Sequence, residues 1–368
     1  MKIALIAPPF VPVPPKTYGG TELFIAHLAE GLQKFGMDVV VYANGESTVD
    51  APVRWLYEKA QWPIQGQIYD CLKDLNHTTW AVADAVRTCD VIHLNNAPGL
   101  SSSRFVELPY VYTIHHPQDD ELTQHYSHFP RIQFVTISNF QRQREMALPK
   151  VCTIHHGIDL SLYHVQDKKQ DYLAFIGRIA PIKGTHIAIE VAKKAGIPLK
   201  IAGEIQPIFR SYYEQQIKPH VDGKFVEYVG EADLTAKNEL LGKARAMLFP
   251  IQWNEPFGLV QIESMACGTP VLALPGGSVR EVVRDGVSGY VCESADELAQ
   301  RACDMSLSPR TVRKYVEANF SHERMLTQYA GVYKELLAGA HVDEVTTGAD
   351  LGPEPATVQG PEEHHAAA

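Results

Sequence analysis

Long apolar runs are missing from this 368-residue sequence. No stretch approaches the roughly 20 apolar residues that a membrane-spanning helix needs. The apolar start at residues 2–7 is interrupted by Pro8 and Pro9, and it is too short for the core of a signal peptide. We therefore expect a cytoplasmic protein without a transmembrane segment, and nothing in the sequence supports a peripheral membrane contact.

Paired cysteines and excess positive charge are missing as well. The six cysteines are scattered without a Cys-x-x-Cys pair, which is typical of reduced thiols rather than of a zinc site or a disulfide framework. Acidic side chains outnumber basic ones by 43 to 33, giving a net charge of −10. This balance argues against nucleic acid as the main partner.

What the sequence does contain is a regular alternation of short apolar segments with helical patterns, in a chain long enough for two domains. This alternation predicts parallel sheets covered by helices, an α/β fold. The expected strands are residues 2–7, 39–42, 91–94, 110–114, 134–137, 151–154, 172–176, 199–202, 225–229, 246–249 and 271–273. The expected helices are residues 21–35, 186–194, 208–217, 258–266 and the helical region 311–337.

A polar connection at residues 157–169 interrupts the alternation and is expected to be a hinge-like linker. We therefore predict a first domain at residues 1–165 and a second at 166–320. A helix at 321–338 is expected to pack back on the first domain. The Gly-, Pro- and Glu-rich end, residues 339–368, is expected to be disordered.

The segment from Glu255 to Pro270 carries the most specific pattern. Glu255 and Glu263 lie eight residues apart, just over two helical turns, with Gly258 between them. Free backbone N–H groups at the start of the helix favour an anion, and the two carboxylates can accept from hydroxyls. This combination suits a phosphorylated sugar. The alternative, a solvated or capping Glu pair, fits the apolar, glycine-bearing surroundings less well, since buried carboxylates need partners.

Two loops at strand ends could hold the rest of such a ligand. Gly19-Gly20 precedes the first helix and would let the backbone approach an anion, although an ordinary βα loop has the same appearance. Arg178 and Lys183 lie in Gly177–Gly184 after a strand, where they could clamp a diphosphate. A solvated basic loop is the alternative. Neither loop is a Gly-x-Gly-x-x-Gly dinucleotide fingerprint.

Histidines also follow strands of the first half. His115 and His116 end one strand, and His155 and His156 follow another. His115 at a strand's carboxyl edge could face a substrate, or it could bond to nearby backbone. Four histidines without a supporting carboxylate or cysteine spacing do not indicate a metal site.

Together these residues resemble the retaining glycosyltransferases of the GT-B fold, family 4, over roughly residues 1–337. Gly19-Gly20 is similar to that family's N-terminal glycine loop, and Gly177-Arg178 with Lys183-Gly184 to its diphosphate clamp. Glu255 and Glu263 match its E-x7-E pair. Pro275-Gly276-Gly277, Glu281 and Gly286–Gly289 resemble its closing segment. The resemblance implies two Rossmann-like doubly wound domains that face each other across a cleft, the first on the acceptor side and the second binding the nucleotide sugar.

The resemblance also implies roles. Glu255 would hold hydroxyls of the donor sugar, and Glu263 would accept from the ribose. His115 would approach the donor sugar from the first domain, so the implied catalytic set is His115, Arg178, Lys183 and Glu255. The implied donor-binding set is Gly19, Gly20, Gly177, Gly203, Phe257, Gly258, Leu259, Val260 and Glu263. Trp253-Asn254 is bulkier than the family pattern, and Gly203-Glu204-Ile205 lacks its second glycine.

We therefore expect a retaining hexosyltransferase that uses a nucleotide-sugar donor, with a UDP-sugar favoured over a GDP-sugar, and no metal or other cofactor. The acceptor, a small molecule, glycan or lipid-linked hydroxyl, cannot be read from the sequence. The aromatic residues Trp55, Tyr57, Trp62, Tyr69 and Trp80 either stack on it or pack structurally. The alternatives are an epimerase or phosphorylase of the same fold, a non-catalytic nucleotide-sugar-binding protein and, more distantly, a nicotinamide dehydrogenase.

Overall fold

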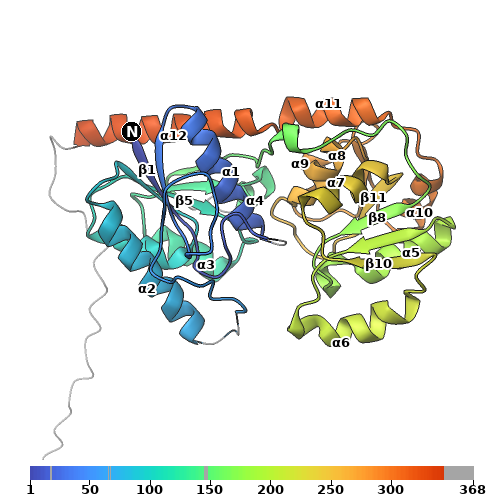
Figure 1. Ribbon diagram of the computed structural model, residues 1–368. Helices are drawn as coiled ribbons and strands as arrows, with labels where there is room; N and C mark the ends of the chain where they lie inside the picture. The colour runs from blue at the N-terminus through green and yellow to red at the C-terminus, as the bar shows by residue number, and fades with distance from the viewer. Residues whose placement is uncertain (17–18, 65, 67, 145–147, 344–368) are drawn as a thin grey trace, which may run out of the picture.

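The computed structural model describes residues 1–343 except 17–18, 65, 67 and 145–147. It contains two parallel sheets, each with its own covering helices (Figure 1). The expected disordered tail, residues 339–368, lies outside the described residues from residue 344 onward.

The first sheet has the strand order β3-β2-β1-β4-β5-β6-β7, with every pair parallel. Its strands are β1 (Lys2–Ile6), β2 (Asp38–Tyr42), β3 (Val53–Arg54), β4 (Val91–Leu94), β5 (Tyr110–Ile114), β6 (Gln133–Thr136) and β7 (Val151–Thr153). The helices of this half are α1 (Gly20–Lys34), α2 (Ile68–Ala85), η1 (Ala97–Arg104), α3 (Asp120–Ser127) and α4 (Asn139–Arg144).

The second sheet has the order β10-β9-β8-β11-β12-β13 and is also parallel throughout. Its strands are β8 (Leu173–Ile176), β9 (Leu199–Ala202), β10 (Val226–Gly230), β11 (Ala246–Phe249), β12 (Val271–Ala273) and β13 (Gly289–Val291). The helices are α5 (Thr185–Ala195), α6 (Arg210–Tyr212), α7 (Leu234–Lys243), α8 (Leu259–Ala266), α9 (Val279–Val282), α10 (Ala295–Cys303) and α11 (Pro309–Asn319).

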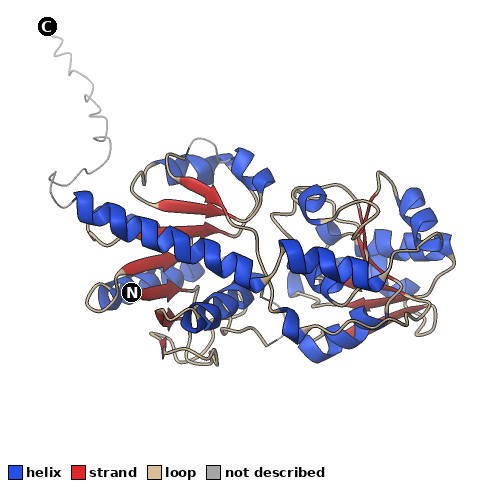
Figure 2. Ribbon diagram, turned by 90° about the horizontal axis from the view of Figure 1, so that it is seen from above, coloured by secondary structure: helices blue, strands red, loops and turns tan. Residues whose placement is uncertain are grey.

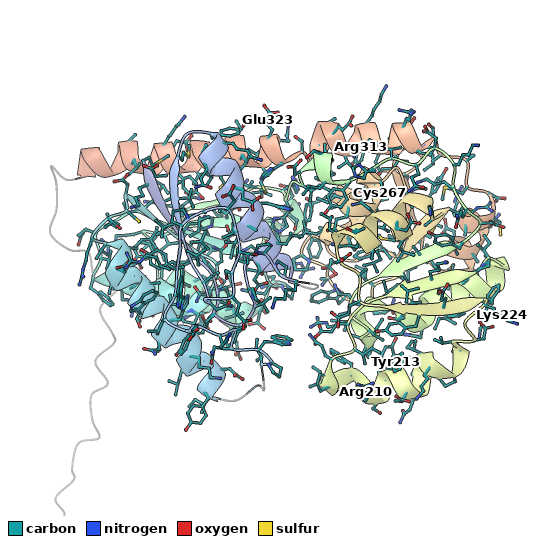
Figure 3. All side chains as sticks on the ribbon, in the orientation of Figure 1. Arg210, Tyr213, Lys224, Cys267, Arg313 and Glu323 are labelled. Atoms are coloured by element: carbon teal, nitrogen blue, oxygen red, sulfur yellow. The ribbon has the colours of Figure 1, made fainter. Side chains whose placement is uncertain are left out.

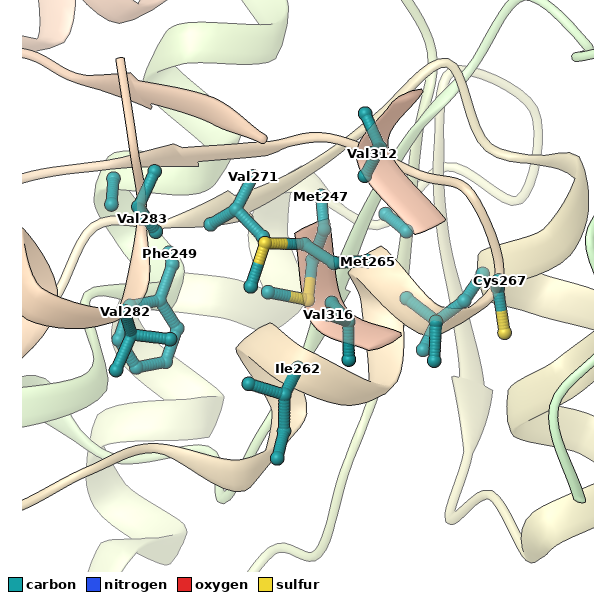
Figure 4. Close-up of a cluster of buried hydrophobic side chains, with 14 of the residues drawn as sticks. Met247, Phe249, Ile262, Met265, Cys267, Val271, Val282, Val283, Val312 and Val316 are labelled. Carbon is teal, nitrogen blue, oxygen red and sulfur yellow. The ribbon is translucent and has the colours of Figure 1, made fainter. Parts of the chain in front are cut away.

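Each sheet has two buried faces, as doubly wound sheets do. Apolar clusters lie on both sides of the first sheet and on both sides of the second. Figure 4 shows the cluster in which Met247 and Val271 of the second sheet pack with Met265 of α8 and Val316 of α11. Two clusters therefore belong mainly to each domain, with Ile137 of the first domain joining the cluster around α8, and α8 packs closely against its sheet.

The last helix, α12 (His322–Asp343), returns to the first domain and packs against α1. Figure 2 shows α11 and α12 end to end along both domains. The Tyr329 hydroxyl lies 3.0 Å from Thr113 Oγ1, and the Tyr333 hydroxyl 2.7 Å from His93 Nδ1. These buried hydrogen bonds make α12 an integral part of the first domain.

Arg313 of α11, labelled in Figure 3, fastens the linker to the second domain. Its guanidinium donates to the carbonyls of Leu160, Tyr163 and Ala266 at 2.7–3.0 Å. Because the first two belong to the linker and the third ends α8, one side chain holds three segments together.

In each sheet the strand order reverses once, between β1 and β4 in the first and between β8 and β11 in the second. Ligands of open α/β sheets bind at the carboxyl edge beside such a reversal. The loops after β1, β8 and β11 carry Gly19, Arg178, Lys183 and Glu255.

Candidate active site at the facing sheet edges

Helix α8 begins without a side-chain cap. Gly258 stands at its N-cap with a φ of 79°, in the left-handed region, and a residue with a Cβ would be strained there. Leu259 and Val260 open the helix, so their N–H groups present the positive end of the helix dipole. Phe257, 1% exposed, is buried in the core of the second domain and anchors this loop.

Glu255 is held by two donors on one oxygen. Its Oε2 accepts from Lys183 Nζ at 2.5 Å and from Trp253 Nε1 at 2.8 Å. The Lys183 ammonium also lies 4.7 Å from the centre of the Trp253 ring, a cation–π distance. The Lys183 and Glu255 side chains are only 12% and 9% exposed. The structure thus brings two predicted site residues together and adds Trp253, which contacts both.

Arg178 follows β8 and lies on the same edge of the sheet. Its guanidinium donates to Gln206 Oε1 at 3.3 Å and lies 5.7 Å from the centre of the Phe209 ring. Gln206 in turn donates to Glu204 at 3.0 Å. Arg178 is therefore positioned by the loop that follows β9, and its immediate partners are different from those of Lys183.

Glu263 is buried within α8 and has its own partners. Its Oε1 accepts from the Tyr163 hydroxyl at 3.0 Å and from Lys237 Nζ at 2.6 Å. Tyr163 comes from the linker and Lys237 from α7. The two carboxylates of the Glu255–Glu263 pattern therefore each meet a lysine from a different element.

Gly203 is required by the close approach of two strand ends. Gly203 has a φ of 154°, and a Cβ there would lie 1.8 Å from the Gly177 carbonyl oxygen. Only glycine fits at such a distance. The pair brings the ends of β8 and β9 together next to Arg178 and Glu204.

The glycine loop of the first domain starts α1, which also lacks a side-chain cap. A Cβ at Gly19 would lie 2.8 Å from Glu22 Oε2, so the Glu22 carboxyl folds back on the loop. Burial raises the pKa of Glu22 to about 7, against the opposing effect of a backbone hydrogen bond. A Cβ at Gly20 would have Leu259 of α8 as its nearest neighbour, at 3.9 Å. Two uncapped helix starts from different domains therefore meet here.

His115, at the end of β5, is enclosed by rings and by an amide. Its Nε2 lies 2.9 Å from Asn95 Oδ1. Its ring stacks on His156 with centroids 5.9 Å apart and packs on Phe24 at 5.0 Å. Burial, followed by the charges of neighbouring histidines, holds the pKa of His115 well below its usual range. His115 is neutral at physiological pH.

Further contacts join the two domains around these residues. The His156 ring meets Phe257 edge-on at 5.1 Å. Glu281 of α9 accepts from the backbone N–H groups of Asn139 and Phe140, at 2.8 and 2.5 Å, and lies 3.0 Å from His155 Nε2. A carboxylate of the second domain thus caps α4 of the first.

The four histidines named in the sequence analysis do not gather around one point. His155 bonds to Glu281, and His116 bonds to the Pro117 carbonyl and the Tyr126 hydroxyl. Within the described ranges, no group of three or more His, Cys, Asp or Glu side chains is arranged to hold a metal ion. The same part of the chain has no helix that is both long and apolar enough to span a bilayer.

Sequence reasoning gave no site role to Asn95, Glu22 or Gln206. A single polar residue after a strand forms no motif, so no signal marked Asn95 or Gln206. The sequence marks Trp253 only as a bulky departure from the family pattern. Its contact with Glu255, two residues on, depends on a loop conformation that the sequence does not reveal.

Two parallel, doubly wound sheets whose carboxyl edges face each other match the GT-B architecture of glycosyltransferases. Residues 18–162 match the model of Glycosyltransferase Family 4, and residues 163–321 match that of Glycosyl transferases group 1. The chain belongs to this family of enzymes and is a glycosyltransferase.

Individual relatives agree with this assignment. An uncharacterized glycosyltransferase of Methanocaldococcus jannaschii is 26% identical, covering 91% of this chain and 98% of the relative. Sucrose-phosphate synthase of Thermosynechococcus elongatus has a similar fold with a TM-score of 0.78 at 20% identity, covering 92% and 99% of the two chains. Anabaena HepE, solved in complex with UDP and glucose, has a TM-score of 0.73 at 19% identity over 91% and 100%.

Proposed function

We propose that this protein transfers a hexosyl group from a UDP-sugar to an acceptor hydroxyl, with retention of anomeric configuration and without a bound metal. The observation that carries the proposal is the meeting of the starts of α1 and α8, with no side-chain cap on either, beside the loops of Arg178 and Lys183. Helix starts and cations together suit a diphosphate. The complex of a structural relative with UDP and glucose supports the choice of nucleotide.

Each residue would then have a separate task. Arg178 and the N–H groups of Leu259 and Val260 would stabilise the charge that develops on the departing diphosphate. The Lys183 ammonium would donate hydrogen bonds both to that diphosphate and to Glu255. Glu255 would hold sugar hydroxyls in attack geometry. Glu263 would accept from the ribose through Oε2, because Oε1 is engaged by Tyr163 and Lys237.

The state of Glu255 favours a front-face route over double displacement. A double displacement needs a carboxylate that is free to attack the anomeric carbon. Glu255 Oε2 already accepts from Lys183 and Trp253, and such hydrogen bonds lower the nucleophilicity of a carboxylate. The acceptor would therefore attack from the side of the departing diphosphate, whose oxygen would take the hydroxyl proton.

The decisive experiment is a panel of UDP- and GDP-hexoses with mass detection of products, run with and without a chelator. We expect transfer or slow hydrolysis of a UDP-hexose, an α-anomeric product from an α-linked donor, and full activity with chelator. Interconversion of the free donor would instead indicate an epimerase. Binding without turnover would indicate a silent nucleotide-sugar-binding protein.

A matched pair of variants tests the diphosphate clamp. Arg178→Ala should lower kcat by on the order of a hundredfold, because it removes a preorganised donor to a developing charge. Arg210→Ala, an exposed arginine of α6, should leave kcat unchanged. Equal kcat values for the two variants, with unchanged melting curves, would contradict the assigned role of Arg178.

A further inference from the structure

Asn95 connects the central backbone of the first sheet to His115. It follows β4, beside the reversal of strand order between β1 and β4. Its backbone N–H donates to the Ile6 carbonyl at 3.1 Å, and its side-chain Nδ2 donates to the same carbonyl at 3.2 Å. Its Oδ1 faces His115 Nε2 at 2.9 Å. The amide is thus fixed at both ends.

These contacts determine which nitrogen of His115 carries the proton. The Ile6 carbonyl can only accept, so the NH₂ end of Asn95 must face it and the oxygen must face the imidazole. An amide oxygen cannot donate, so His115 Nε2 is the protonated nitrogen. A neutral imidazole carries a single ring proton, and Nδ1 of His115 therefore has a bare lone pair.

The ring is also fixed in orientation and in charge. Phe24 and His156 pack against it at 5.0 and 5.9 Å between centroids. His93, His116 and His156 are the titratable groups that act on it, and together with burial they keep its pKa low. The packed rings restrict rotation of His115, and the lowered pKa favours the neutral ring, in which Nδ1 is an acceptor.

We propose that Asn95 is a positioning residue that fixes the tautomer of His115, so that His115 Nδ1 accepts a hydrogen bond from one hydroxyl of the donor sugar. This inference rests on the proposed function, in which His115 approaches that sugar. It adds a rule of donor selection. At the position that faces His115, the sugar must carry a group that donates a hydrogen bond.

Donor analogues that lack this hydroxyl test the rule through their kcat/KM. Replacing the hydroxyl by hydrogen removes the hydrogen bond to His115 Nδ1. Replacing it by fluorine, which only accepts, sets two electron-rich atoms against each other. The expected order of kcat/KM at that position is hydroxyl, then hydrogen, then fluorine. Fluorine also slows transfer by withdrawing electrons from the anomeric carbon, so the order is compared between the wild type and His115→Gln; a protonated Nδ1 would make the fluoro donor relatively better in the wild type, because fluorine can accept a weak hydrogen bond and hydrogen cannot.

The tautomer itself is measured by long-range ¹H–¹⁵N NMR on protein labelled at its histidines. We expect the His115 signals of a neutral ring protonated at Nε2. His115→Gln assigns those signals by their loss. A ring protonated at Nδ1 in the wild-type protein would overturn the inference without any need for activity or for a variant of Asn95.

Kinetics with monodeoxy and monofluoro UDP-hexoses complete the test. We expect one sugar position at which the deoxy donor loses on the order of tenfold or more in kcat/KM and the fluoro donor at least as much. His115→Asn, whose amide lies near the place of Nδ1, should keep part of this discrimination. His115→Gln, whose amide lies near Nε2, should lose it, and Asn95→Leu should weaken it.

The outcomes separate this inference from the proposed function. If the wild-type protein turns over no parent donor, the proposed function fails. If it turns over a UDP-hexose but no position shows the expected order, or if His115→Asn and His115→Gln behave alike, the role of His115 Nδ1 is wrong and the proposed function stands.

Discussion

Trp253 donates a hydrogen bond from its indole N–H to Glu255, and the face of its ring contacts the Lys183 ammonium. The family pattern places small residues here, so this indole adds a second anchor for the carboxylate. If Lys183 turns toward a phosphate, Glu255 loses one donor but keeps the other. Trp253 would then hold Glu255 in place during the reaction.

We expect Trp253→Phe to lower kcat about fivefold, because it removes the indole N–H and keeps the ring. In a Glu255→Ala background the same substitution should have no further effect. Steady-state kinetics on the four proteins measure this coupling. Phe105→Leu, at an exposed ring of the first domain to which no role in the site is assigned, is the control. Equal losses in both backgrounds would show that Trp253 acts only on packing.

Glu22 makes stability depend on pH. Burial raises its pKa from 4.5 to about 7, so between these values the native state holds a proton that the unfolded chain releases. Stability therefore falls as the pH rises through this window. The loss is on the order of 1–3 kcal/mol.

Glu22→Gln should remove this dependence, because an amide stays neutral at every pH. Relative to the wild type, the variant should gain stability between pH 5 and pH 8, as measured by chemical denaturation at both values. Glu323→Gln, at an exposed position, should show no such gain. A constant difference between Glu22→Gln and the wild type across this range would refute the assignment.

At the scale of elements, α4 depends on a carboxylate from the other domain. Burial raises the pKa of Glu281, but hydrogen bonds from His155 and from the backbone of Asn139 and Phe140 outweigh it, and the net direction is downward. The stabilisation is therefore present at neutral pH and is lost as the pH falls toward the native pKa.

Glu281→Gln should weaken this cap and the domain contact together, since a neutral amide accepts less strongly than a carboxylate. Hydrogen exchange at the amides of Asn139 and Phe140 should accelerate at pH 7, while exchange in β4 stays unchanged. Glu293→Gln, an exposed carboxylate paired with Arg280 of α9, is the control. Unaltered protection of both amides would show that another contact holds α4.

Most strands were predictable because they are short apolar runs, whereas β3 and β13, which have two and three residues and are only partly buried, were not predicted. β4, β5, β9, β11 and β12 have the expected bounds, and the other predicted strands differ by one or two residues. Helix α2 was not predicted, and its burial explains why. Ile68 and Tyr69 are 72% and 67% exposed, whereas Asp70, His77 and Thr78 are buried. In its first part, α2 therefore reverses the amphipathic pattern from which a helix is recognised, and only Ala81, Val82 and Ala85 near its end are buried apolar residues.

The site was predictable only as far as its motifs extend. Gly258 and Gly203 have backbone conformations that require glycine, so the sequence marks them. Asn95 and Trp253 act through side-chain directions that arise when separate loops meet. Residues 208–217, predicted as one helix, form successive 3₁₀, α and π turns, a detail that apolar periodicity does not resolve.

At the scale of the whole molecule, the chain crosses between the domains twice at one place. The Ile158 N–H donates to the Phe320 carbonyl, and the His322 N–H donates to the Ile158 carbonyl, at 3.1 and 3.0 Å. A Cβ at Gly157 would lie 2.3 Å from the Ser321 carbonyl oxygen. The linker and the junction of α11 and α12 are therefore paired, and any change in the angle between the domains bends both.

Gly157→Ala should separate the two crossings, because a backbone carbonyl cannot retreat cheaply from a new methyl group. We expect a melting temperature lower by several degrees and a changed radius of gyration in X-ray scattering. Gly331→Ala, on α12 with nothing within 4 Å, should be neutral or slightly stabilising. Equal melting temperatures for the two variants would show that the pairing of the two crossings does not contribute to stability.

The return of α12 to the first domain has a consequence for synthesis on the ribosome. Met325, Leu326 and Tyr329 complete the apolar core beside β1 and α1, yet they are translated after the entire second domain. The first domain therefore leaves the exit tunnel with one apolar side uncovered and waits for its last helix. The first domain is synthesised first and completed last. During that interval we expect a chaperone to bind its uncovered apolar side.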